Sequence, residues 1–272
     1  MIRPGLLVDV DTVPDDVVLL DTRLTTAGSP GRERYDAGHL PGAVYVDLDA
    51  DLAGPPGPGG RHPLPSTEHF VEAMQRAGVN RGSSVVVYDD GPATAAARLW
   101  WLLLDHGHDD VMVLDGGLAA WAANGQPLST DPATPEPGDW TGAPGDLPTV
   151  DADGAAAVAR AGVLVDVRAA VRFRGEQEPL DPVAGHIPGA VNAPLSELTD
   201  ELGRFGSPNA ISRRLAGLVA GASAPVAVYC GSGVTACQTI LALRLVGVDA
   251  ALYPGSWSEW ITDPRRPVAT GA

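Results

Sequence analysis

The sequence contains no lysine, so arginine and six histidines are its only basic side chains. Eighteen arginines face 34 acidic residues in 272, which gives a net charge of −16 at pH 7 and a pI near 4.5. Nucleic acids and anionic membranes are bound through concentrated positive charge. The composition therefore excludes nucleic acid and an anionic membrane surface as principal partners.

Cysteine is equally scarce, with only Cys230 and Cys237. Secreted domains that are stabilised by disulfides contain more cysteines than these two. Acidic residues near the N-terminus also interrupt any apolar run that resembles a signal peptide. Residues 215–243 carry no charge, but Pro225 and several glycines break this stretch into a predicted strand, loop and helix rather than a membrane span. The histidine spacings suggest no metal site. We expect a cytoplasmic protein without metal or cofactor.

The most informative feature is internal repetition. Similar segments recur in the same order: 19–23 and 164–168, 38–44 and 185–191, 85–88 and 226–229, and Gly116 with Trp121 and Gly255 with Trp260. This indicates one fold written twice, with an N-terminal domain at 1–126 and a C-terminal domain at 150–272. Residues 127–149 are rich in proline, which predicts a linker that lies over the surface rather than packed structure.

Within each copy, short apolar β-branched runs alternate with helical segments. The runs are 17–20, 85–88, 111–114, 163–167 and 226–229, and Ser66 marks a helix start before Phe70. Strands of this kind separated by helices predict an α/β fold, in which each copy is a mainly parallel sheet flanked by helices on both faces. Ligands bind such sheets at the loops that follow the strands.

The loop after 226–229 has the composition of a nucleophile cradle. Cys230 is followed by Gly231-Ser232-Gly233-Val234-Thr235 and then a helical segment. The unpaired N–H groups and positive dipole of a helix start favour a thiolate, and the glycines let the backbone curve around an anion. The alternative is a cysteine that packs at a strand end. The first copy has Asp89 at this position, so the sheet itself does not require a cysteine.

The other cysteine and the repeated histidines have simpler interpretations. Cys237 lies seven residues further on, about 10 Å along a helix and beyond disulfide reach, so we predict core packing. His39 and His186 occur in the same Gly-His-x-Pro-Gly turn of both copies, which predicts a structural role.

The repeat, the Gly-His-Ile-Pro-Gly-Ala segment at 185–190 and the loop 230–235 together resemble the two-domain rhodanese-like sulfurtransferases. The loop is most similar to the 3-mercaptopyruvate sulfurtransferase branch. The resemblance implies tandem rhodanese-like domains, a catalytically silent first domain with Asp89 in the cysteine position, and a ping-pong reaction through a persulfide on Cys230. The donor would be 3-mercaptopyruvate, and the acceptor cyanide, a small thiol or a thioredoxin-like protein. The amides of Gly231, Gly233, Val234 and Thr235 would then stabilise the sulfur anion.

The resemblance also assigns side chains. Arg172, the first arginine of Arg-Phe-Arg-Gly, would bind the anionic donor, as a guanidinium suits a carboxylate, whereas Arg174 could be a surface charge. Asp49 and His62 from the first domain, with Ser232 across the interface, would form an acid–base relay. Alternatively, His62 simply occupies a proline-rich turn, and Arg61 beside it either assists the anion or is solvated.

Three alternatives remain open at this level. Mercaptopyruvate enzymes commonly carry an arginine just after a Glu-Pro, where this chain has Leu180 and Asp181, so thiosulfate:cyanide transfer is possible. A phosphatase would need an arginine six residues after the cysteine, but the chain has Ala236 there. In a non-enzymatic sulfur-carrier module, only Cys230 would matter.

Overall fold

The structure is a computed structural model that describes residues 5–25, 29–219 and 224–272. Residues 220–223, inside the uncharged stretch noted above, lie outside the described residues. Two sheets dominate the fold, and all strand pairs described in them are parallel. The first runs in the order β1 (Leu7–Val8), β5 (Val111–Leu114), β4 (Val85–Tyr88), β2 (Val18–Asp21), β3 (Val44–Tyr45). The second runs β7 (Val191–Asn192), β6 (Val163–Asp166), β8 (Val226–Tyr229), β9 (Ala251–Leu252).

Helices connect these strands and cover the sheets. The α-helices of the first half are α1 (Gly31–Ala37), α2 (Leu48–Asp51), α3 (Thr67–Arg76), α4 (Thr94–Asp105) and α5 (Gly117–Ala123). Those of the second half are α6 (Ala152–Ala161), α7 (Ala170–Phe173), α8 (Pro208–Val219), α9 (Ala236–Leu245) and α10 (Ser256–Trp260). Two 3-10 turns, Val10–Thr12 and Leu195–Glu197, complete the described elements. Ser66 caps α3 by accepting a hydrogen bond from the His69 amide, as the sequence predicts.

Alternating side chains along each strand enter separate cores. In β4, Val85 and Val87 contribute to a core shared with α3 and α4, whereas Val86 and Tyr88 pack on the opposite side with α5. In β8, Val228 faces α9, and Ala227 and Tyr229 face α6 and α10. Both faces of each sheet are therefore covered by helices, which confirms the predicted α/β architecture.

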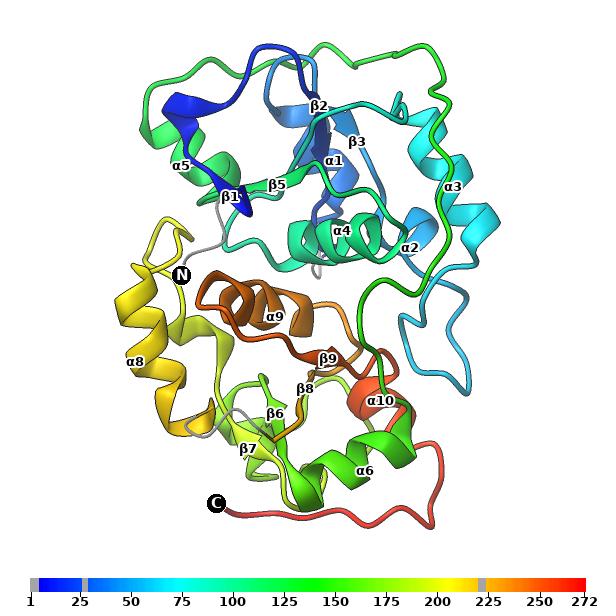
Figure 1. Cartoon of the computed structure of the whole chain (residues 1–272), viewed down its shortest axis with the longest axis vertical. Helices are drawn as coiled ribbons and strands as arrows, with labels where there is room; N and C mark the ends of the chain where they lie inside the picture. Colours follow the sequence, from blue (N-terminus) through cyan, green and yellow to red (C-terminus); the bar gives the residue numbers. More distant parts are fainter. Residues whose placement is uncertain (1–4, 26–28, 220–223) are drawn as a thin grey trace.

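The two halves meet through helices α4 and α9, which lie side by side between the two sheets (Figure 1). One core cluster runs continuously from β4 through these helices to β8. Nearly all of α9 is buried, including the polar side chains of Gln238 and Thr239. A helix enclosed between two domains has no solvent face, so burial extends around it.

The segment 127–149 differs from its prediction as a surface linker. It runs along the outside of the first domain (Figure 1), but Trp140 is buried and packs edge-on against Phe70. The Gly138 amide donates to Gln75 O and the Trp140 amide to Val79 O. The prolines prevent a regular element, while a single tryptophan anchors the segment in the core.

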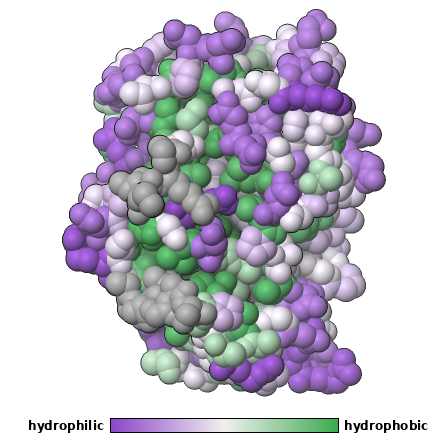
Figure 2. All heavy atoms as spheres, viewed as in Figure 1, coloured by the Kyte–Doolittle hydropathy of each residue, from purple (hydrophilic) through white to green (hydrophobic). Residues whose placement is uncertain are grey.

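The described helices include none that is long and apolar enough to cross a membrane. On the face drawn in Figure 2, hydrophilic residues dominate the outer rim and hydrophobic residues show mainly inside it.

Candidate active site

Cys230 lies directly after β8, at the carboxyl edge of the second sheet. Its Sγ accepts a hydrogen bond of 3.1 Å from the Gly233 amide, and its own amide donates to Ser256 Oγ at 3.1 Å. The residue is only 1% exposed. Within the described residues, Gly233 is the only member of the predicted loop whose amide donates to this sulfur.

The loop geometry depends on glycine at one position. Gly233 has φ +78°, and a Cβ there would collide with the carbonyl oxygen of Pro254. A side chain would therefore push the Gly233 amide away from Cys230. Val234 is buried in the core, and Thr235 immediately precedes α9.

The matching loop of the first domain already holds an anion. Asp89 Oδ1 accepts hydrogen bonds from the amides of Gly91 and Ala93, and Oδ2 from those of Ala95 and Ala96, at 2.9–3.3 Å. Burial raises the pKa of Asp89, and these amide hydrogen bonds oppose that shift. A strand-to-helix loop of this fold thus provides a ring of N–H groups for a negative charge.

Asp49, His62 and Ser232 come together across the domain interface. His62 Nδ1 lies 2.7 Å from Ser232 Oγ, and His62 Nε2 lies 3.0 Å from Asp49 Oδ1. Asp49 is in α2, His62 is in the loop before α3, and Ser232 follows β8. An ionised carboxylate only accepts hydrogen bonds, so Nε2 carries the proton of the neutral ring and Nδ1 accepts from the serine hydroxyl.

The surroundings of His62 favour the neutral form of its ring. Its pKa is lowered from the ordinary value of 6.5, first by burial and further by the charges of Arg61 and Arg98, while Asp49 works in the opposite direction. A neutral histidine bonded to a hydroxyl and oriented by a carboxylate can accept and return a proton. The arrangement is therefore chemically suited to a proton relay.

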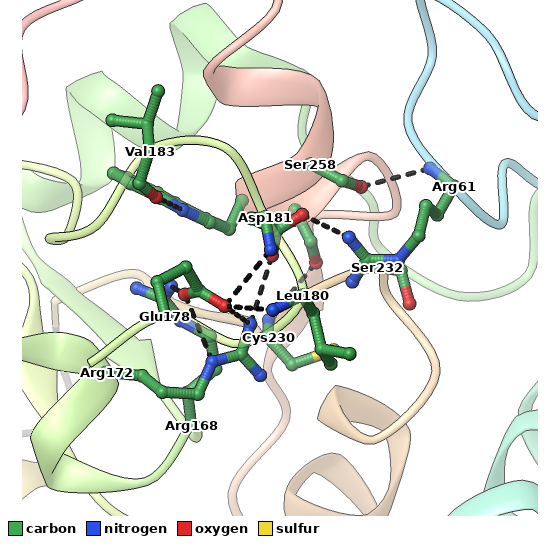
Figure 3. Close-up of polar contacts among 12 residues, drawn as sticks. Arg61, Arg168, Arg172, Glu178, Leu180, Asp181, Val183, Cys230, Ser232 and Ser258 are labelled. Carbon is green, nitrogen blue, oxygen red and sulfur yellow. Dashed lines mark hydrogen bonds and ion pairs between the residues drawn. The ribbon is translucent and has the colours of Figure 1, made fainter. Parts of the chain in front are cut away.

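Arg172 lies in α7 and is already ion-paired. Its Nη2 is 2.6 Å from Glu178 Oε1 and 3.0 Å from Asp181 Oδ2. Burial acts to raise the pKa of Glu178, but hydrogen bonds from Arg172 and the Leu180 amide lower it overall. Figure 3 shows Arg172, Glu178 and Asp181 gathered beside Cys230. The sequence pattern indicates the arginine, but not the two carboxylates that neutralise it.

Two further residues near the loop, Ser256 and Arg98, are not predicted by the sequence patterns. Ser256 Oγ binds the Cys230 amide, although the residue has φ +54°. Arg98 in α4 is fully buried, and its guanidinium donates to the carbonyls of Gly233 and His62 at 3.3 Å. The spacing of the repeat could have pointed to Ser256, because it lies 139 residues after Gly117, whereas no local pattern marks Arg98.

Cys237 packs in the core as predicted. Its side chain is fully buried, and burial raises its pKa to about 12. Both cysteines are free. In the described part of the chain, no group of three or more His, Cys, Asp or Glu side chains could hold a metal ion.

Comparison with known proteins gives consistent results. A family profile for the rhodanese-like domain matches residues 10–124 and 152–263. A Pseudomonas aeruginosa protein named "Probable 3-mercaptopyruvate sulfurtransferase" is 47% identical over 94% of this chain and 93% of its own. A Mycobacterium tuberculosis protein named "Putative thiosulfate sulfurtransferase SseB" is 42% identical over 94% of this chain and 92% of its own. The crystal structure of SseA from Escherichia coli, titled as a 3-mercaptopyruvate sulfotransferase, superposes with a TM-score of 0.83 at 32% identity, over 94% of this chain and all of that one.

Proposed function

The chain belongs to the rhodanese family and is a sulfurtransferase, and we propose that it takes sulfur from 3-mercaptopyruvate through a persulfide on Cys230. The persulfide then passes its outer sulfur to cyanide or to a thiol, either a small thiol or a thioredoxin-like protein. We place the enzyme in the cytoplasm, where thiols stay reduced and a catalytic cysteine remains available.

The first half-reaction balances within the donor and the site. The Cys230 thiolate attacks the thiol sulfur of 3-mercaptopyruvate; an S–S bond forms, the C–S bond breaks, and its electron pair passes to the pyruvate enolate. The enolate carbon takes up a proton as the outer sulfur of the persulfide loses one. Pyruvate and a persulfide anion result, and the net proton count is unchanged.

The remaining residues take roles in that step. The neutral His62 ring first accepts, through the hydroxyl of Ser232, the proton that the donor sulfur loses, and Asp49 stabilises the charged ring. His62 then returns this proton to Ser232 as Ser232 gives its own to the enolate carbon. The Gly233 amide bonds the sulfur of Cys230 and supports its negative charge. The amides of Gly231, Val234 and Thr235 and the side chain of Arg172 complete the proposed donor and persulfide site.

One observation carries the choice of donor: the chain of hydrogen bonds from Asp49 through His62 to Ser232. Thiosulfate transfers its outer sulfur and leaves as sulfite, so no carbon needs a proton. Mercaptopyruvate leaves as an enolate that must be protonated. A proton relay beside the nucleophile therefore favours a donor whose leaving group is an enolate that needs a proton on carbon.

The test compares two donors in one variant. We expect His62→Ala to reduce kcat/KM for 3-mercaptopyruvate by about 100-fold and to change the value for thiosulfate by less than about threefold. Glu68→Gln, at an exposed position of the nearby helix α3, provides the control. Equal losses with both donors would contradict the relay, and a wild-type enzyme that gains no sulfur on Cys230 from either donor would contradict the persulfide.

Thiosulfate is the second candidate donor. Leu180 and Asp181 follow Glu178-Pro179, so the arginine that mercaptopyruvate enzymes commonly carry at this point is absent. One relative with 42% identity is named "Putative thiosulfate sulfurtransferase SseB". A higher kcat/KM for thiosulfate than for 3-mercaptopyruvate in the wild-type enzyme would favour this alternative.

A further inference from the structure

A loop of the first domain brings Arg61 over the loop that carries Cys230. The Arg61 amide donates to Ser258 Oγ at 3.0 Å, and the Ser258 amide donates to Gly231 O at 2.9 Å. Gly60 has φ +101°, and a Cβ there would lie 2.8 Å from the carbonyl oxygen of Gly255. The backbone of Arg61 is thus fixed against the second domain at the edge of the nucleophile loop.

The guanidinium groups of Arg61 and Arg172 converge above Gly231. A Cβ on Gly231 would lie 2.9 Å from Arg61 Nη2, and 3.7 and 3.9 Å from Nη2 and Nη1 of Arg172. Asp181 lies between the two groups: Oδ1 pairs with Arg61 Nη1, and Oδ2 pairs with Arg172 Nη2 at 3.0 Å (Figure 3). The Asp181 side chain is only 2% exposed.

Each arginine keeps an uncommitted nitrogen near the loop. Among the described residues, no acceptor takes a hydrogen bond from Arg61 Nη2 or Arg172 Nη1, because the side-chain hydrogen bonds come from Arg61 Nη1 and from Nε and Nη2 of Arg172. Both nitrogens lie within 4 Å of the position that a Cβ on Gly231 would occupy. Two guanidinium N–H groups that converge from different domains suit the two oxygens of a carboxylate.

We propose that Arg61 is the second donor-binding arginine of this enzyme and that Asp181, between Arg61 and Arg172, restricts the donor to a single negative charge. The inference rests on the proposed function, whose donor carries one carboxylate. With Glu178 and Asp181 both ionised, the two arginines and two acids sum to zero charge. Electrostatic repulsion from Asp181 scales with ligand charge, so it opposes the thiosulfate dianion about twice as strongly as a monoanion.

Arg61→Ala tests the binding role. We expect the KM for 3-mercaptopyruvate to rise about 10- to 100-fold, the loss typical of a charged hydrogen bond, with kcat at saturating donor and the KM for the acceptor close to wild type. Arg61→Lys keeps the positive charge but loses the forked pair of N–H groups. Its KM for 3-mercaptopyruvate should therefore lie between those of the wild type and Arg61→Ala. A donor KM within twofold of wild type in Arg61→Ala would overturn the assignment.

Asp181→Asn tests the charge restriction. The ratio of kcat/KM for thiosulfate to that for 3-mercaptopyruvate should rise at least about fivefold, because the amide keeps the shape and removes the charge. An unchanged or smaller ratio would overturn this part of the proposal.

The exposed ion pair Arg174–Glu176 in the same segment supplies matched controls. Arg174→Ala and Glu176→Gln should leave both donor KM values within twofold of wild type, and a change as large as that of Arg61→Ala would overturn the specific role of Arg61. Intact mass after incubation with 3-mercaptopyruvate separates the two proposals. If wild type gains no sulfur on Cys230, the proposed function fails; if it gains sulfur and Arg61→Ala has a normal KM, only this inference fails.

Discussion

At the scale of single residues, Ser256 shows that the site retains backbone strain. Its φ of +54° matches that of Gly117 (+51°), which occupies the same place in the first copy. A serine in this left-handed region costs on the order of 1 kcal/mol. Its Oγ accepts from the Cys230 amide and donates to the Tyr253 carbonyl at 2.9 Å. The second copy therefore keeps a strained serine where the first copy has a relaxed glycine.

Ser256→Gly should separate stability from activity. Loss of the strain and loss of the hydroxyl bonds oppose each other, so the free energy of unfolding should change by less than about 1 kcal/mol. We expect kcat to fall about tenfold because the backbone of Cys230 is held less firmly. Urea unfolding and steady-state kinetics measure the two quantities, and an unchanged kcat would contradict the positioning role.

The two cysteines should behave oppositely. Cys230→Ser should abolish turnover and the added sulfur seen by intact mass, because a hydroxyl cannot form the persulfide. Cys237→Ser should retain most of the activity, since this thiol is buried and burial raises its pKa to about 12. Equal activity of wild type and Cys230→Ser would reject the mechanism.

The proposed relay predicts a specific pH dependence of the ratio between the rates with the two donors. Both donors need the thiolate, so dividing the 3-mercaptopyruvate rate by the thiosulfate rate isolates His62. Because burial lowers the pKa of His62, this ratio should stay constant on acidification and fall only below pH 6.5, where the ring becomes protonated. Asp49→Asn removes a charge that raises this pKa, so the midpoint should move still lower. A midpoint above 6.5 in the wild type would be inconsistent with the neutral relay.

At the scale of elements, the start of α4 shows how the first domain uses the loop that corresponds to the Cys230 loop. Asp89 satisfies four amides that would otherwise be unpaired at a helix N-terminus. In the second copy, the corresponding loop holds the sulfur of Cys230, which accepts a hydrogen bond from the Gly233 amide. At the same point of the repeat, one copy thus binds its own carboxylate and the other holds a cysteine sulfur.

Asp89→Ala should therefore destabilise the protein. We expect a loss of about 2 kcal/mol in the free energy of unfolding, because buried amides lose their acceptor. Asp90→Ala is the neighbouring control: Asp90 pairs with Arg34 at a partly exposed site and should cost less than about 1 kcal/mol. Denaturant titration gives both values, and a stability equal to wild type in Asp89→Ala would show that burial of the carboxylate cancels its hydrogen bonds.

At the scale of the whole molecule, Arg98 joins the two domains. Its guanidinium is buried at the interface and donates to carbonyls of both: Leu52, His62 and Pro63 in the first, Gly233 in the second. With one side chain it holds the backbone of His62 and that of Gly233. The first domain thus places Asp49, His62 and Arg98 against the loop of the second domain that carries Cys230.

Arg98→Met keeps the length of the side chain and removes these hydrogen bonds. We expect the free energy of unfolding to fall by about 2 kcal/mol, and kcat with 3-mercaptopyruvate to fall by more than tenfold because His62 and Gly233 lose their common anchor. Arg76→Met, on an exposed face of α3, is the control. Wild-type kinetics in Arg98→Met would show that the anchor is dispensable.

The sequence by itself determined the repeated α/β fold, because short β-branched runs, helix caps and turn residues are local patterns that act in each copy alike. It also singled out Cys230, since the repeat places it against Asp89. Only the tertiary structure decided how Trp140 anchors the segment between the domains, how Ser256 holds Cys230, and how Asp181 joins Arg61 to Arg172. Arg61 and Asp181 are 120 residues apart, and no spacing encodes their contact. It follows from the packing of α4 against α9, which fixes one domain over the other.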